Sequence, residues 1–196
     1  MSVIDIESLL TEISPDNQAG EDMEYDPAFI ELVEAIEGSS GQQLGDTFAE
    51  GVEPDWKKAQ SIATELFSRT KDIRVGVYLV QALINTHAYA GFADGVLLLE
   101  RLVSRYWDTL HPQLDPDDDN DPTMRINVIA TLADFDATIN PIRLAPLVSS
   151  KMMGQFSLRD TDIAHGVISL PDGYDGVVPD TASRAFFRSG LATLFM

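Results

Sequence analysis

The sequence of 196 residues contains no cysteine, which excludes disulfide bonds and thiolate metal sites and is consistent with a reducing compartment. No apolar run reaches the roughly 18 to 20 residues that a membrane-spanning helix needs. The first twelve residues carry Asp5, Glu7 and Glu12 but no basic residue, unlike the start of a signal peptide. We therefore expect a soluble cytoplasmic protein that is not inserted directly into a membrane.

Basic residues are missing from the first part of the chain. Residues 1–56 hold 15 Asp and Glu and no Lys or Arg, and the whole chain has a formal net charge of −19. Such a charge repels nucleic acid and anionic lipid and favours basic protein surfaces. Two interpretations stay open: the acidic segment binds a basic partner, or it only confers solubility.

Helices are indicated along most of the chain, because prolines and acidic residues recur before segments whose apolar residues are spaced by three and four. Asp26 is the expected N-cap of one helix, and Pro27 suits its first turn. The expected helices cover about residues 3–13, 27–38, 56–70, 72–90 and 92–110, and a further one follows Pro122.

Residues 72–90 are apolar on more than one side, which predicts a central, buried helix. Gly91 is expected to allow a tight reversal, so that residues 92–110 return as an antiparallel partner. The helix after Pro122 is expected to cover this pair with Ile126, Ile129, Leu132 and Ala133.

Prolines and glycines interrupt the pattern beyond Asn140, so residues 141–179 are expected to be irregular, with room for one short strand pair. A last helix is signalled by Asp180 as its cap. The predicted fold class is all-α: a compact bundle or short solenoid of antiparallel helix pairs, with an irregular segment near 141–179 and a C-terminal helix.

Several short motifs follow one another in a characteristic order. They are Gly20, Glu21, Asp22; Tyr25, Asp26, Pro27; Asp55, Trp56; Lys71, Asp72, Ile73, Arg74; Tyr106, Trp107, Asp108, Leu110, His111, Pro112; Arg125; and Phe156, Ser157, Leu158, Arg159, Asp160. In this order they resemble the ImpA-related N-terminal domain of the TssA component of bacterial type VI secretion systems, over about residues 14–166.

The resemblance implies a binding activity and no enzyme activity. It implies contacts with other secretion proteins, which are those of the baseplate, membrane complex, tube or sheath. It also implies that the chain is a fragment of a longer protein. We expect two parts in this chain, a helical domain at 1–166 and, where the resemblance fades, a C-terminal extension at 167–196 that ends in a helix and packs on the same domain.

Physical roles are expected for several motif residues. Lys71 and Arg74 are expected to pair with Asp22, Glu24 or Asp72 and so to fix the acidic N-terminal segment. Trp107 is expected to pack into the core at a helix end, and the alternative is that it is a contact for a partner. Arg125 is expected to pair with Asp121 four residues earlier.

Apolar residues near the C-terminus are the candidate partner-binding side chains. They are Phe186, Phe187, Leu191, Leu194 and Phe195. The alternative is that these residues close the domain's own core or form a homodimer interface.

Catalytic, cofactor and metal sites are not predicted. The run from Asp115 to Asp121 alternates like a calcium loop, but its sixth position is Asn120 and its twelfth is Ile126. The three histidines are isolated from one another. Two other functions stay open: an acidic mimic of nucleic acid that occupies a basic DNA-binding protein, and a hydrolase with a carboxylate pair.

Overall fold

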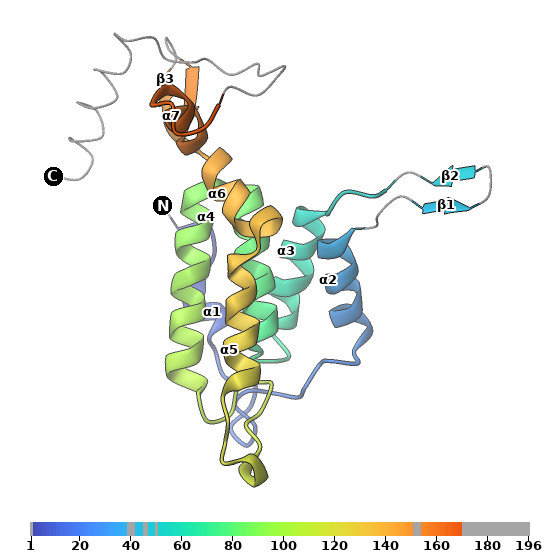
Figure 1. Cartoon of the computed structure of the whole chain (residues 1–196). Coiled ribbons are helices and arrows are strands. Elements are labelled where there is room, and N and C mark those ends of the chain that lie inside the picture. Colours follow the sequence, from blue (N-terminus) through green and yellow to red (C-terminus); the bar gives the residue numbers. More distant parts are fainter. Residues whose placement is uncertain (1, 39–41, 45–46, 50, 151–153, 170–196) are drawn as a thin grey trace, which may run out of the picture. The chain divides into compact units, whose positions relative to one another are not determined.

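The computed structural model describes residues 2–38, 42–44, 47–49, 51–150 and 154–169. It divides into two compact units, Met1–Ile139 and Asn140–Met196, and each is described by itself. Helices dominate, but the described residues also form two separate two-stranded antiparallel sheets (Figure 1). The predicted all-α class is therefore correct only in its main part, because short hairpins accompany the helices.

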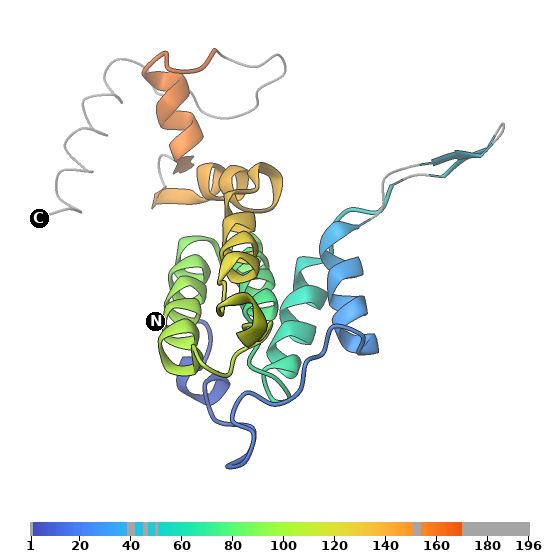
Figure 2. The ribbon, with the colours of Figure 1, turned by 60° about the horizontal axis from the view of Figure 1, so that its bottom comes forward.

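The first helices of unit one begin where their caps predict. Helix α2 (Pro27–Glu37) starts at Asp26, whose carboxylate accepts the Ala28 N–H at 2.9 Å. Helix α3 (Trp56–Leu66) starts at Asp55, whose carboxylate accepts the Lys58 N–H at 3.0 Å. Helix α1 (Ile6–Leu9) is shorter than predicted. Figures 1 and 2 show α3 lying between α2 and α4.

Helix α4 (Ile73–Tyr106) consists of two antiparallel arms, residues 73–87 and 89–106. The antiparallel pair was predicted, but the reversal lies at Ala88, with φ 53° and ψ −143°, and not at Gly91. Gly91 serves the close approach of the arms instead, since a Cβ there would lie 2.4 Å from the Leu83 carbonyl oxygen.

The core of unit one is built around α4. Its largest fully buried apolar side chains are Leu10, Leu32, Leu66, Phe67, Ile73, Leu79, Leu83, Leu98, Leu102 and Leu110. They come from α2, α3, both arms of α4 and the segments beside them. The predicted central position of residues 72–90 is thus confirmed.

Helix α5 (Thr123–Ala130) packs on α4 with a different face from the predicted one. Arg125 is buried and Val128 half-buried, whereas Ile126 and Ile129 are 57% and 37% exposed. Successive helical residues are about 100° apart, so Ile126 turns to the outside when Arg125 and Val128 face inward. Ile129 lies about 40° from Arg125 and about 100° from Val128, which places it at the edge of the contact, in keeping with its smaller exposed fraction.

Shorter elements complete unit one. The acidic loop contains a 3-10 turn, η1 (Pro116–Asp118), and α5 is followed by η2 (Thr131–Ala133) and a π-helical turn, η3 (Phe135–Ile139). Strands β1 (Gln42–Leu44) and β2 (Thr47–Ala49) form a hairpin between α2 and α3. No helix in the described ranges is long and apolar enough to cross a membrane.

Unit two is described up to residue 169. Helix α6 (Asn140–Leu144) precedes a hairpin of β3 (Pro146–Ser150) and β4 (Gly154–Ser157), and helix α7 (Leu158–Ala164) follows. The predicted strand pair is confirmed, but α7 was not predicted. It begins with a reciprocal cap between Ser157 and Asp160. The expected terminal helix lies outside the described residues.

Candidate functional site

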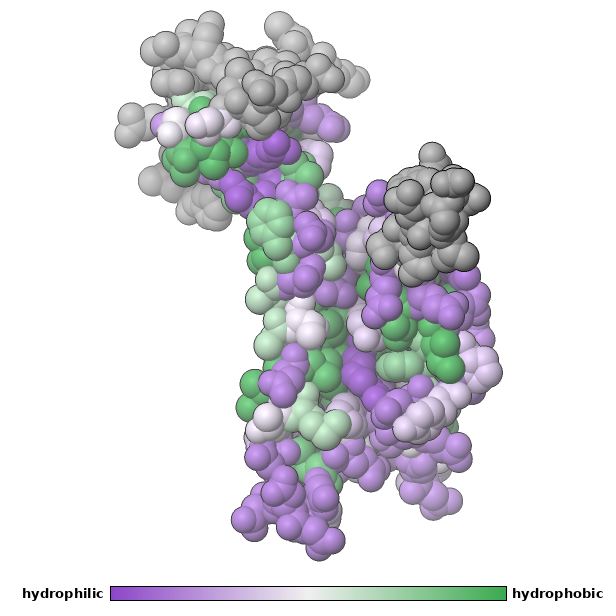
Figure 3. All heavy atoms as spheres, turned by 45° about the vertical axis from the view of Figure 1, so that its right-hand side comes forward, coloured by the Kyte–Doolittle hydropathy of each residue, from purple (hydrophilic) through white to green (hydrophobic). Residues whose placement is uncertain are grey.

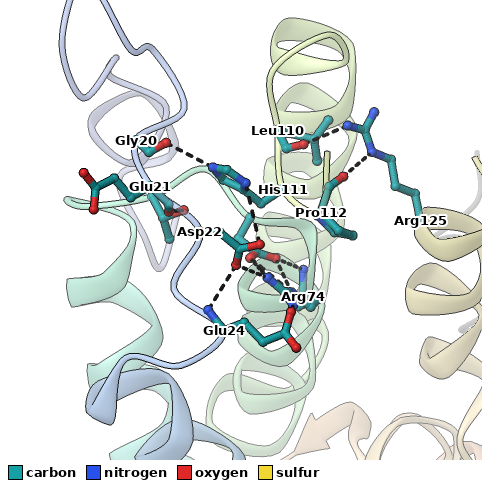
Figure 4. Close-up of polar contacts among 11 residues, drawn as sticks. Gly20, Glu21, Asp22, Glu24, Arg74, Leu110, His111, Pro112 and Arg125 are labelled. Carbon is teal, nitrogen blue, oxygen red and sulfur yellow. Dashed lines mark hydrogen bonds and ion pairs between the residues drawn. The ribbon is translucent and has the colours of Figure 1, made fainter. Parts of the chain in front are cut away.

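Arg74 holds the N-terminal segment onto α4. Its guanidinium contacts Asp72 and Asp22 at 2.6 Å each and Glu24 at 3.0 Å (Figure 4). We call Asp22, Glu24, Asp72 and Arg74 the Arg74 cluster. The predicted pairing of Arg74 is thereby confirmed.

The charges of the Arg74 cluster are paired within the protein, which gives the cluster a structural role. Burial lowers the pKa of the Arg74 guanidinium, but hydrogen bonds to Asp72, Glu24 and Asp22 outweigh that effect and raise it above its ordinary value. Burial also opposes the lowered pKa of Asp22, which its hydrogen bonds from the Glu24 N–H and Arg74 produce. Since three carboxylates already neutralise Arg74, little of its charge remains to attract an anionic ligand.

Lys71 does not join the cluster, and its predicted pairing with a carboxylate was wrong. Its side chain is buried, its Nζ donates to the Phe67 carbonyl oxygen, and it lies 5.8 Å from the centroid of the Phe67 ring. Burial, together with the nearby charge of Arg105, lowers the pKa of Lys71 to about 8.

His111 joins the end of α4's second arm to the N-terminal segment. Its Nε2 donates to the Gly20 carbonyl oxygen at 3.0 Å, and its backbone N–H donates to the Lys71 carbonyl at 3.0 Å. The Ile73 N–H returns a bond to the His111 carbonyl at 2.9 Å. The two motifs that contain Lys71 and His111 thus form one buried junction.

Arg125 fastens α5 to the turn after α4. Its guanidinium donates to the carbonyl oxygens of Pro112 at 2.9 Å and Leu110 at 2.7 Å (Figure 4). It also donates to the Trp107 carbonyl oxygen at 2.6 Å and lies 4.8 Å from the centroid of the Trp107 ring. The predicted ion pair with Asp121 was wrong, because Asp121 accepts from the Thr123 N–H. Trp107 is 38% exposed and covers Arg125, so it is not the expected core side chain.

An open groove of about 630 Å³ lies in unit one. Residues Arg74, Val77, Tyr78, Gln81 and Asn85 of the first α4 arm line it. On one side it is lined by Ile36, Glu37, Glu53, Pro54 and Trp56, and on the other by Val128, Thr131, Asp134, Asp136 and Ala137. Figure 3 looks at this side of the helices, where apolar side chains are flanked by hydrophilic ones.

Amide side chains hold the segments that line the groove to one another. The Asn85 Nδ2 donates to the carbonyl oxygens of Gln81 (2.8 Å) and Ala137 (3.0 Å), and the Gln81 Nε2 donates to that of Thr131 (3.4 Å). These bonds tie the first α4 arm to η2 and η3. One oxygen of Asp134 also accepts the Ala137 N–H at 2.7 Å. The carboxylates of Glu37, Glu53 and Asp136, with the other oxygen of Asp134, are therefore the main polar groups that the groove offers to a ligand.

An apolar stripe runs along the outer face of α5. Ile126, Ile129 and Ala130 share this face and are all exposed. We call these three residues the α5 stripe. Contiguous exposed apolar surface of this kind marks interaction sites in many proteins.

Comparison with known proteins identifies the family. The family model described as ImpA, N-terminal, type VI secretion system matches residues 10–134. The chain belongs to this family. Residues 10–134 of this ImpA N-terminal domain include the Arg74 cluster, the His111 junction, Arg125 and all of the groove lining except Asp136 and Ala137.

Two relatives support the assignment to the ImpA N-terminal family. The type VI secretion system component TssA1 of Pseudomonas aeruginosa is 40% identical over 157 residues, which are 80% of this chain and 45% of the relative. The chain thus spans about half the length of this curated relative. A solved N-terminal domain of the TssA component from Burkholderia cenocepacia, including its conserved ImpA_N region, matches with a TM-score of 0.69 and 28% identity. That match covers 99% of this chain and 78% of the solved one.

The predicted partner-binding residues of this ImpA N-terminal chain, Phe186, Phe187, Leu191, Leu194 and Phe195, lie outside the described residues. Sequence reasoning did not identify the groove. Its carboxylates Glu37 and Glu53 lie about 80 to 100 residues before Asp134 and Asp136, and no local motif connects the two pairs. Arg125, Val128 and Leu132 are spaced by three and four residues and so share one helix face. This spacing was the sequence signal that could have identified the buried face of α5 and left the α5 stripe exposed.

Proposed function

We propose that this chain is a protein-binding domain of a TssA-type assembly component, which acts in the cytoplasm by contacting other type VI secretion proteins. The candidate partners are proteins of the baseplate, membrane complex, tube and sheath. The observation that carries the proposal is the α5 stripe, exposed beside an open groove in a domain of the ImpA N-terminal family.

The names of the relatives support the same proposal. Both are TssA components of type VI secretion systems, and the match to the Burkholderia cenocepacia domain covers nearly all of this chain. A binding role requires exposed, complementary surface and needs no cofactor, and the α5 stripe and the groove supply such surface.

The nucleic-acid mimic is less well supported, because many acidic side chains of the N-terminal segment already have internal partners. Asp22 and Glu24 pair with Arg74, and Asp26 pairs with Arg69. Further pairs are Glu31 with Lys58 and Glu7 with Arg101. A mimic needs its carboxylates free to replace phosphates.

The structure gives little support to the hypothesis that the chain is a hydrolase. A general acid needs a carboxyl with a raised pKa beside its substrate. Burial does raise the pKa of Asp72, against the effect of hydrogen bonds from Arg74, but its side chain is fully buried and caps α4. This position suits a structural role.

The terminal residues Phe186, Phe187, Leu191, Leu194 and Phe195 remain a second proposed binding surface, either for a partner or for a second copy of the chain. Measuring the molar mass of the Leu194→Asp variant distinguishes the possible roles of this segment. Unfolding indicates that the segment closes the core, conversion of a dimer to a monomer indicates a homodimer interface, and loss of a partner from a folded monomer indicates partner binding.

A pull-down tests the proposed function. The chain is immobilised and exposed to purified baseplate, sheath, tube and membrane-complex proteins at low and high salt. We expect capture of at least one component, weakened but not abolished by salt because apolar burial contributes to it. Capture of none contradicts the proposal, and capture of basic DNA-binding proteins with a steep loss in salt favours the mimic.

A further inference from the structure

The groove carries negative charge that the protein does not neutralise. Glu37, Glu53, Asp134 and Asp136 line it, and none of them takes part in an ion pair within the described ranges. Arg74 also lines the groove, but Asp22, Glu24 and Asp72 already neutralise it. An occupant therefore meets a negative field at the walls.

The groove has the length of a short helix. Its lining residues on α4 run from Arg74 to Asn85, eleven positions along one helical arm, which corresponds to about 16 Å at 1.5 Å per residue. About three turns of a second helix fit along this length.

Apolar side chains lie between the carboxylates. Val77 and Tyr78 come from α4, Trp56 and Ile36 line one side, and Val128 lines the other. Trp56, Ile36, Tyr78 and Val128 are half-buried, so each has surface left to cover. A tryptophan at the side of such a groove is a typical anchor for binding energy.

We propose that this groove binds an amphipathic helix of a partner protein, with an apolar face that enters the groove and Lys or Arg residues that flank it. Charge complementarity selects this occupant, because cations on both sides of an apolar face match the carboxylates of both walls. A second copy of the chain is disfavoured as the occupant, since two molecules with a formal charge of −19 repel each other. The inference rests on the proposed function in that the partner is another secretion protein.

Peptide binding tests the groove directly. Overlapping peptides of about 15 residues, long enough for the three turns that fit the groove, tile the baseplate, sheath, tube and membrane-complex proteins. Their binding to the intact chain is measured by fluorescence anisotropy. We expect the bound peptides to carry Lys or Arg beside apolar residues at helical spacing, and to bind less tightly as salt increases.

Charge reversal locates the site. Glu37→Lys with Asp136→Lys should weaken the bound peptides at least tenfold, a loss of about 1.4 kcal/mol. The control, Asp16→Lys with Asp117→Lys, makes the same change in net charge at exposed residues that do not line the groove, and should change the affinity less than about threefold. Circular dichroism confirms that both variants are folded.

Three results overturn the inference: bound peptides that lack basic residues, equal affinity of the groove and control variants, and a dimer of the chain that the groove variant converts to a monomer. If no peptide binds while an intact component is captured, the groove inference fails and the proposed function stands. If no intact component is captured, the proposed function fails, whatever the peptides do.

Discussion

Removing the Arg125 guanidinium should strongly destabilise unit one. Arg125 is 1% exposed and donates to three main-chain carbonyls that end the second arm of α4 and the turn after it. Arg125→Met keeps most of the side-chain volume but leaves these carbonyls without their donor.

The magnitude follows from the hydrogen bonds. A bond to a charged group contributes about 1.5–3 kcal/mol, so three bonds give at least about 4.5 kcal/mol. Burying the guanidinium has a cost, which the methionine does not have, and burial indeed lowers the pKa of Arg125. We expect a net loss of about 3 kcal/mol in the free energy of unfolding.

Tryptophan fluorescence during urea unfolding measures this loss, because both tryptophans, Trp56 and Trp107, belong to unit one. The matched control is Arg101→Met, which removes an exposed ion pair with Glu7 and should cost less than about 1 kcal/mol. If Arg125→Met costs no more than Arg101→Met, the reasoning about Arg125 is refuted.

Two further predictions concern a buried charge and a close backbone approach. The pKa of Lys71 is about 8 in the folded chain and 10.5 ordinarily, so between these pH values the folded chain binds fewer protons than the unfolded chain. The free energy of unfolding should therefore rise by about 2 kcal/mol from about pH 8 to about pH 10. Urea unfolding across this range should show the rise in the wild type and not in Lys71→Met, and an equal rise in both would contradict the assignment. Gly91→Ala should cost about 2 kcal/mol because its Cβ would meet the Leu83 backbone, whereas Gly95→Ala, with nearest contacts of 3.1–3.3 Å, should cost less. Thermal unfolding of the two variants checks this order, and equal melting temperatures would contradict it.

The parts of the fold that depend on local chemistry could be predicted from the sequence. Asp26 and Asp55 cap helices because their carboxylates accept bonds from N–H groups two or three residues later. Residues 73–87 form a central helix, buried along most of its length, because apolar side chains occur on several of its faces. These signals lie within a few turns of one another.

The rest depends on contacts between distant segments. Arg125 looked like the partner of Asp121, and only the folded chain brings the carbonyls of Trp107, Leu110 and Pro112 to it. That contact sets the rotation of α5 and exposes the α5 stripe. Glycine often marks a turn, so the sequence placed the reversal at Gly91, whereas the structure has it at Ala88. Gly91 is instead required for the close packing of the two arms of α4.

The central claim is that this domain binds a type VI secretion protein through exposed surface of unit one. The most direct measurement is the dissociation constant of the captured component for the wild type and for Ile126→Asp with Ile129→Asp, determined by isothermal titration calorimetry. Met124→Asp, at an exposed residue on another face of α5, is the control. We predict at least tenfold weaker binding for the folded stripe variant and little change for the control. Binding of the stripe variant as tight as that of the wild type would contradict a role for the α5 stripe, and a wild type that binds no secretion component would contradict the account as a whole.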